Sequence, residues 1–270
     1  MKAKGFLIIP VIIIILVVIW FFMRKNETHK EYKDFSQIKA QGILHIVTDY
    51  NSVGYYVSGD TIAGFNHDLI QLLESYTPLK FDIQLESSLE KSIEDLKLGR
   101  YDIVARNIPV TSELRDSINF TESVAQNRQV LIQRKKKFND GTEPIRSHLD
   151  LAKKTLYVPS KSPVILRIQN LSHEIGDTIY IKEDSIYGSE QLAMMVASKD
   201  IDFAVCDEKA AASIAKTLPE IDYSTFIGFT HLEAWAVRKN SPVLLDSLDT
   251  WITRMKGTKS YNDIYKKYYK

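Results

Sequence analysis

A long apolar stretch near the N-terminus is the first pattern in the chain. Residues 6–23 read FLIIPVIIIILVVIWFFM, without a charged residue. A helix that spans the hydrocarbon core needs about 20 apolar residues, and the aromatic residues that end this stretch suit the membrane interface. No Ala-x-Ala-like cleavage site and no lipid-accepting cysteine follow it. We therefore expect residues 1–25 to form an uncleaved signal anchor and transmembrane helix, and residues 26–35 a polar tether.

Beyond residue 35, apolar residues alternate between the period of a strand and that of a helix. Short β-branched or alternating runs predict strands, and stripes at i, i+3 and i+4 predict helices. The predicted strands cover 43–48, 79–84, 101–105, 130–133, 155–158, 178–182, 201–206 and 234–238. The predicted helices cover 65–76, 89–96, 189–197, 242–255 and 261–268, and two more begin at 162–163 and at 207. This order predicts an α/β fold with mostly parallel sheets.

The predicted strands and helices fall into two sets along the chain. The first set ends near Val130, and the second begins near Thr155 after a charged connection. We therefore expect two α/β lobes with a cleft between them. In open α/β sheets, ligands bind beyond the carboxyl ends of the strands, so polar residues at these ends are candidates for a site.

Charge and composition exclude some classes of partner. The first 33 residues hold six of the 35 Lys/Arg and two of the 34 Asp/Glu, so the remainder has a net charge of −3. A nucleic-acid surface would show a concentrated basic stripe, and we expect no nucleic-acid partner. The single cysteine, Cys206, cannot form an internal disulfide and reads as a buried apolar residue. The histidines show no metal-binding spacing, and we expect neither a metal nor a cofactor.

The chain resembles the family 3 extracellular solute-binding proteins, which carry polar amino acids to ABC transporters. The resemblance covers about residues 36–270, and the order and spacing of its segments carry it. These segments are GILHIVT, GFNHDLIQLLESY, GRYDIVARNIPVTSELRDSINFTES, DIDFAVCDEKAA and AWAVRKNSPVLLDSLDTWITRMKGTKSYNDIYKKYY. The segment QNRQVLIQR and the anchor are most similar to the non-catalytic N-terminal domain of the membrane-bound lytic murein transglycosylases F.

The resemblance implies a two-lobed type II periplasmic binding protein fold, preceded here by the transmembrane helix. In this fold the chain enters the second lobe once and returns. Lobe one would then comprise 36–132 plus 230–270, and lobe two 133–229. The soluble domain would lie in the periplasm, held to the cytoplasmic (inner) membrane by one span. The basic residues flanking the apolar stretch lean mildly toward the opposite orientation, but large domains translocate largely regardless of such charges.

The resemblance also implies a set of ligand-binding residues. In the family, an Arg soon after a Thr binds the ligand carboxylate with paired charge-assisted bonds. Thr111 and Arg115 match this role, although their spacing is one residue longer than the usual Thr-x-x-Arg. One extra residue rotates a helical side chain by about 100°, so Arg106 and Arg128 stay open as alternatives. Asn107 stands where the family has small or hydroxyl residues.

Further positions complete this set. The family's ammonium-binding Asp corresponds to Asp207, and the lobe-two loop that assists the carboxylate corresponds to Ser160 and Ser162. Tyr55 matches an aromatic position that packs on the ligand, and Asp49 directly follows the first predicted strand. Purely structural roles stay open: Asp207 could only start a helix, Ser162 could only be an N-cap, Arg115 could be an exposed helix residue, and Tyr55 could pack between loops.

Two classes of function follow from this interpretation. As a binding module, the chain would close two lobes on an amino acid, short peptide or muropeptide and present the closed form to an ABC permease or a cell-wall enzyme. As an enzyme, it would resemble the few dehydratases of this fold and use Asp49, Glu190 or Asp207 as acid or base. These acids have no recognisable catalytic partner in the sequence, and we expect no transglycosylase domain after residue 270. The binding module is therefore favoured, without catalytic residues.

Overall fold

The computed structural model describes residues 33–269, and the chain from Asp34 onward forms one compact unit. The predicted signal anchor at 1–25 and most of the predicted tether lie outside the described residues. Within the described residues, no helix has the length and apolar character needed to cross a membrane.

The first lobe is built on a five-stranded mixed sheet. Its strand order is β4 (Lys80–Leu85), β1 (Ile43–Thr48), β5 (Ile103–Pro109), β12 (His231–Val237) and β6 (Asn119–Asn127). The strands β4, β1 and β5 are parallel, whereas β12 runs antiparallel to both of its neighbours, β5 and β6. A small separate hairpin of β2 (Tyr56–Ser58) and β3 (Thr61–Ala63) follows β1 in the chain.

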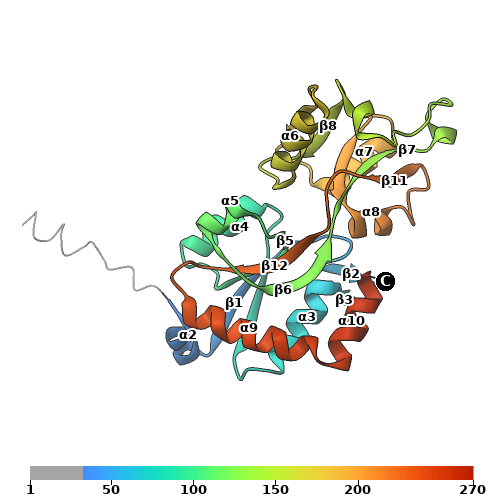
Figure 1. The fold of residues 1–270 in the computed structure, drawn as a ribbon. Coiled ribbons are helices and arrows are strands. Elements are labelled where there is room, and N and C mark those ends of the chain that lie inside the picture. Colours follow the sequence, from blue (N-terminus) through green and yellow to red (C-terminus); the bar gives the residue numbers. More distant parts are fainter. Residues whose placement is uncertain (1–32, 270) are drawn as a thin grey trace, which may run out of the picture. The chain divides into compact units, whose positions relative to one another are not determined.

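Helices cover both faces of the first sheet (Figure 1). One face packs on α2 (Phe35–Gln41), α3 (Phe65–Glu74), α9 (Pro242–Lys256) and α10 (Lys259–Tyr269), and the other on α4 (Leu89–Lys97) and the short α5 (Ser112–Ser117). Neighbouring strand residues such as Ile46 and Val47 therefore enter opposite cores, and both are fully buried. This explains why the central strands read as continuous apolar runs.

The second lobe is built on another five-stranded mixed sheet. Its order is β11 (Ile221–Phe226), β7 (Gln129–Arg134), β10 (Ala204–Asp207), β8 (Thr155–Pro159) and β9 (Tyr180–Asp184). Helices α7 (Ser189–Ala197) and α8 (Glu208–Ile214) pack on one face, and α6 (Val164–Ile175) packs on the other with the short 3₁₀ turn η2 (His148–Leu151). A second 3₁₀ turn, η1 (Lys136–Phe138), follows β7.

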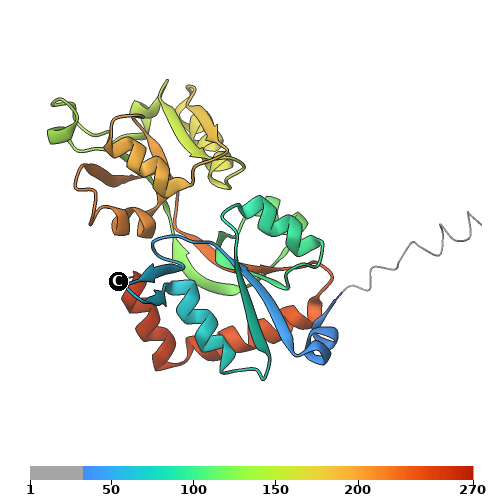
Figure 2. The ribbon, with the colours of Figure 1, turned by 180° about the vertical axis from the view of Figure 1, so that it is seen from behind.

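The chain passes twice between the two sheets. The first passage runs from β6 to β7 through Arg128, and the second runs from β11 to β12 through residues 227–230. Figure 2 shows these two passages side by side, as Figure 1 does from the other side. The predicted lobe boundary after residue 132 falls within β7, and the boundary after residue 229 falls between β11 and β12.

Two features of the predicted fold need correction. The sheets are mixed, because one strand of each, β12 in the first and β7 in the second, runs antiparallel to both of its neighbours: each sheet has two parallel and two antiparallel pairings. The helix expected from Ser162 with Pro163 as its first residue begins at Val164, with Pro163 as its N-cap residue. The preceding turn includes Lys161 at a φ of 55°, and this turn delays the helix by one residue.

Candidate functional site

A charged pair lies at the edge of the lobe-one sheet that faces lobe two. Since β1 and β5 are adjacent and parallel, residues just after β1 and near the end of β5 meet at one edge. There, a guanidinium nitrogen of Arg106 lies 3.0 Å from a carboxylate oxygen of Asp49, and both side chains are largely buried. The amide of Asn51 donates to the same oxygen at 2.9 Å. The other oxygen of Asp49, Oδ1, is buried without a hydrogen-bond partner among the described residues.

Lobe two contributes a carboxylate to the same region. Asp207 ends β10 and stands at the N-cap position of α8, where its side chain accepts a hydrogen bond from Gln129 Nε2 at 2.9 Å. Burial raises the pKa of Asp207 to about 6; the Gln129 bond opposes this shift, the Asp49 carboxylate adds to it and Arg106 opposes it. Charges from both lobes therefore act on one carboxyl group.

A second acid lies close to Asp207. Glu233, on β12, is fully buried and accepts hydrogen bonds from Asn107 at 2.6 Å, Asn127 at 3.1 Å and Tyr269 at 3.1 Å. Burial, together with the nearby Asp207 charge, raises the pKa of Glu233 to about 8, although the three hydrogen bonds oppose the shift. The site thus contains more acidic than basic side chains.

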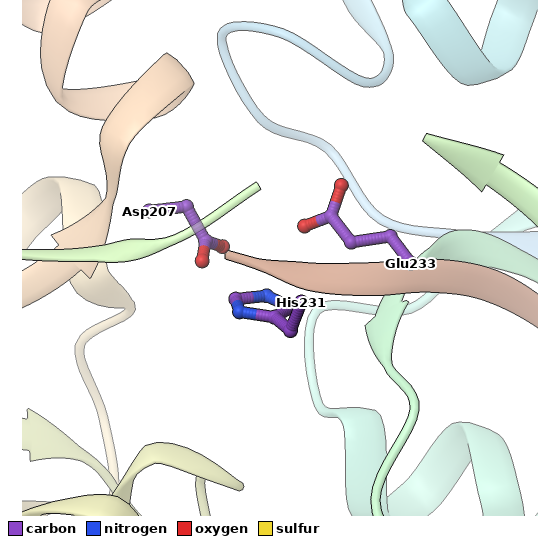
Figure 3. Close-up of side chains that lie close together, drawn as sticks. All are labelled: Asp207, His231 and Glu233. Carbon is purple, nitrogen blue, oxygen red and sulfur yellow. The ribbon is translucent and has the colours of Figure 1, made fainter. Parts of the chain in front are cut away.

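Asp207, Glu233 and His231 form a group that could hold a metal ion. One donor atom from each of the three residues lies within 4.8 Å of the others, and Figure 3 shows the three side chains pointing toward one another. A histidine nitrogen with two carboxylates is a donor set that divalent transition metals accept.

Polar contacts link the lobes directly. The backbone amide and hydroxyl of Ser52 donate to Glu190, at the start of α7, at 2.8 and 2.7 Å. On the other side, the ammonium group of Lys161 forms an ion pair with Glu90 of α4. The lobes therefore meet through polar groups, which suits an interface that opens and closes.

The family model of the bacterial extracellular solute-binding proteins, family 3, matches residues 43–270. The chain belongs to this family. A curated relative, a membrane-bound lytic murein transglycosylase F from Desulfosudis oleivorans, is 23% identical over 250 residues, covering 93% of this chain and 53% of that protein. The chain spans about half the length of the curated relatives it matches.

Solved structures confirm the two-lobed fold of this solute-binding family member. An ancestral arginine-binding protein bound to arginine matches with a TM-score of 0.73 and 20% identity, covering 85% of this chain and 99% of that one. A solute receptor for L-cysteine of Neisseria gonorrhoeae matches with a TM-score of 0.75 and 18% identity, covering 88% of this chain and 94% of that one. At these identities the likeness establishes the fold alone.

The three arginines considered for the solute carboxylate have different surroundings. Arg115 is exposed on α5, and its guanidinium lies 5.7 Å from the ring centroid of Phe120. Arg128 forms two bonds with Glu208, at 2.8 and 3.0 Å, and stacks on Phe226 at 3.5 Å. Arg106 is the one that the structure brings together with Asp49 and Asp207.

Other predicted residues have structural contacts of their own. Thr111 caps α5 by accepting from Leu114 N at 3.3 Å. Ser160 is exposed and donates to Glu183 at 3.0 Å, and Ser162 accepts from Val164 N at 3.4 Å.

Two predicted residues point into lobe one. Tyr55 is buried, and its ring meets His67 edge-on at 5.4 Å. Asn107 donates to Glu233, and its own Oδ1 is buried without a partner among the described residues. These contacts make Asn107 a support for Glu233 and Tyr55 part of the packing around α3.

Sequence reasoning missed Glu233 and His231, and, of the groups that bond to Glu233, it named only Asn107. Glu233 lay just outside the strand predicted at 234–238, and His231 was considered only for spacing to other histidines. A signal did exist, because a glutamate in the apolar run HLEAWAV is costly to bury without a role.

Proposed function

We propose that the protein is a membrane-anchored, extracytoplasmic solute-binding protein that binds a small ligand carrying both an ammonium and a carboxylate group. An amino acid or a short peptide has this chemistry. One observation carries the proposal: Asp49 and Arg106 of lobe one and Asp207 of lobe two interact electrostatically across the lobe boundary. The role is binding without catalysis, for transport or for sensing.

The charges suit such a ligand in a specific way. The planar guanidinium of Arg106 can form paired bonds to a carboxylate, and Asp207 can accept from an ammonium group. The unpartnered Oδ1 of Asp49 offers a further acceptor. A ligand that supplies donors and a carboxylate to these groups would favour an arrangement of the lobes that keeps all three groups within its reach. The arginine and L-cysteine named for the structural neighbours belong to the same ligand class.

The names of the curated relatives favour a second role for the same site. Several of them are membrane-bound lytic murein transglycosylases F. This supports a sensor of cell-wall metabolism, whose ligand would be a muropeptide and whose partner would be a cell-wall enzyme rather than an ABC permease.

A ligand screen tests the binding role. The thermal unfolding of the chain would be followed with amino acids, short peptides and muropeptides as separate panels. A ligand at one hundred times its Kd stabilises the fold by about 2.7 kcal/mol, and the panel that responds separates the two roles. Asp207→Ala should abolish the shift. A flat response to all three panels would contradict the proposal.

The arginines provide a matched pair for the same assay. Arg106→Met should weaken binding by at least about tenfold, since a charge-assisted bond contributes about 1.5–3 kcal/mol, whereas Arg115→Met should leave the ligand Kd unchanged. If the two variants gave the reverse result, the carboxylate would bind at α5 and not beside Asp49.

The anchor and the location are tested on cells. Ile186 is 82% exposed, whereas Cys206, the single native cysteine, is buried. In intact spheroplasts, a membrane-impermeant maleimide should label the Ile186→Cys variant and leave the native chain unlabelled. Labelling of the variant only after lysis would place the domain in the cytoplasm. Recovery of the chain in the membrane fraction would support the anchor.

A further inference from the structure

Three potential metal ligands converge where the second passage between the lobes enters lobe one. His231 and Glu233 are two residues apart on β12, so their side chains project from the same face of the strand. Asp207 approaches from the end of β10 in lobe two. The donor atoms lie within 4.8 Å of one another, and no other such group of His, Cys, Asp and Glu occurs among the described residues.

The imidazole of His231 has a buried nitrogen that no other group satisfies. Its Nε2 has no hydrogen-bond partner among the described residues. A buried polar atom without a partner is costly, and a metal ion bound through a ring nitrogen is a common role of neutral histidine.

The two carboxylates are also fixed by outer hydrogen bonds. Gln129 holds Oδ1 of Asp207, Asn127 holds Oε1 of Glu233, and Tyr269 holds Oε2 of Glu233. Such outer partners orient metal ligands and tune their basicity.

Within the described residues, neither carboxylate of this group forms an ion pair with a lysine or an arginine, and Arg106 acts on Asp207 only at a distance. Arg106 is paired with Asp49, and Arg128 is paired with Glu208. The polar partners of Glu233 in the described structure are amide and phenol groups. Two close carboxylates at a buried position repel each other, and a bound divalent cation would remove this repulsion.

We propose that Asp207, His231 and Glu233 bind a divalent transition-metal ion of the zinc type, which would join lobe two to the strand that returns to lobe one. A nitrogen with two oxygens favours zinc, because Mg²⁺ and Ca²⁺ prefer oxygen ligands throughout. Three protein ligands leave one position of a tetrahedral zinc site for water or for a donor group of a bound solute.

Direct metal binding tests the site. The untagged full-length chain would be purified in detergent, stripped with EDTA, and titrated with Zn²⁺ by calorimetry, with the bound metal counted by mass spectrometry. We expect a single zinc ion per chain, no comparable binding of Mg²⁺ or Ca²⁺, and, with Co²⁺, the intense visible absorption of a tetrahedral site. Zinc bound no more tightly than Mg²⁺ would overturn the proposal, whatever the variants show.

Matched variants localise the ion. His231→Gln should weaken zinc binding by more than about 100-fold, and Gln129→Ala by about 10–100-fold, because outer partners contribute that much. His67→Gln is the control, since His67 also pairs with a carboxylate, that of Asp68 at 2.9 Å, but lies outside the group. Unchanged affinity in His231→Gln, or an equal loss in His67→Gln, would overturn the assignment. Tryptophan fluorescence of each variant checks its folding.

Discussion

The strand pair of β5 and β12 carries a fully buried acid at each end, and the surroundings of the two acids differ. Asp102 directly precedes β5, where a guanidinium nitrogen of Arg238 lies 3.1 Å from its carboxylate and the amide of His45 donates at 3.0 Å. Glu233 lies at the opposite end, close to lobe two, where it accepts only from neutral amide and phenol groups within the described structure.

The difference separates an acid that is compensated within its lobe from one that is not. A buried acid that is paired with a buried cation is compensated within the lobe, and removing either partner leaves an uncompensated charge. Glu233 has no such partner, so burial and the Asp207 charge hold its pKa high. Its charge can then be compensated by something that arrives between the lobes, such as an ammonium group or a metal ion.

The largest effect on stability is expected at Asp102, the acid that is paired with Arg238. Asp102→Ala would leave the guanidinium of Arg238 buried without its carboxylate, and this should lower the free energy of unfolding by about 3–5 kcal/mol. Urea denaturation followed by circular dichroism measures it. Glu143→Ala is the control, because Glu143 pairs with Lys136 at an exposed site, and such pairs contribute about 0–1 kcal/mol. Equal losses in the two variants would mean that Asp102 does not have the proposed structural role.

At the opposite end of the strand pair, the contribution of Glu233 to stability should depend on pH. The pKa of Glu233 is higher in the folded chain than in the unfolded chain, so the folded chain binds more protons in the interval between the two values. The stabilising contribution of protonated Glu233 is therefore complete below the ordinary glutamate pKa and is lost as pH rises toward about 8. The charge of Asp207 acts on Glu233 and strengthens the trend, while Asp49 and Arg106 act with opposite sign on Asp207.

Glu233→Gln tests this trend. In EDTA, the wild-type free energy of unfolding should fall between pH 5.5 and 8.5 by on the order of 1–3 kcal/mol more than that of the variant, since one pKa unit corresponds to about 1.36 kcal/mol. Urea denaturation at both pH values measures the difference. Parallel pH profiles for the two chains would show that Glu233 titrates normally and would remove the contrast with Asp102.

Parts of the fold could be predicted closely because local pattern and packing agree there. Strand 43–48 and helix 189–197 match the observed bounds, since the strand is an apolar run between two helical layers and the helix has a clear apolar stripe. β6 was missed because NFTESVAQN mixes Thr, Glu, Ser and Gln into an edge strand whose buried residues do not alternate, since its register with β12 shifts.

The residues of the candidate site also divide into those that the sequence predicted and those that it did not. Asp49 and Asp207 follow from the rule that ligands bind beyond strand ends, and Arg106 was considered as an alternative on similar grounds. Arg115 illustrates the limit of sequence alone, because the start of α5 is set by the Thr111 cap, and one residue decides which way the guanidinium projects. Glu233 depends on contacts with Asn107, Asn127 and Tyr269, which lie far apart in the chain.

The smallest effect concerns the phenol that supports Glu233. Tyr269 is buried, and its hydroxyl donates to Oε2 of Glu233 at 3.1 Å. Tyr269→Phe should therefore lower the free energy of unfolding by about 1 kcal/mol, the usual contribution of one hydrogen bond. The loss should be larger at pH 8.5 than at pH 5.5, because the bond favours the ionised form of Glu233. The control is Tyr180→Phe at an exposed position, which should change stability by less than about 0.5 kcal/mol at either pH. A pH-independent loss in Tyr269→Phe would mean that the hydroxyl bonds equally well to protonated and ionised Glu233, and that the two asparagines alone favour the ionised form.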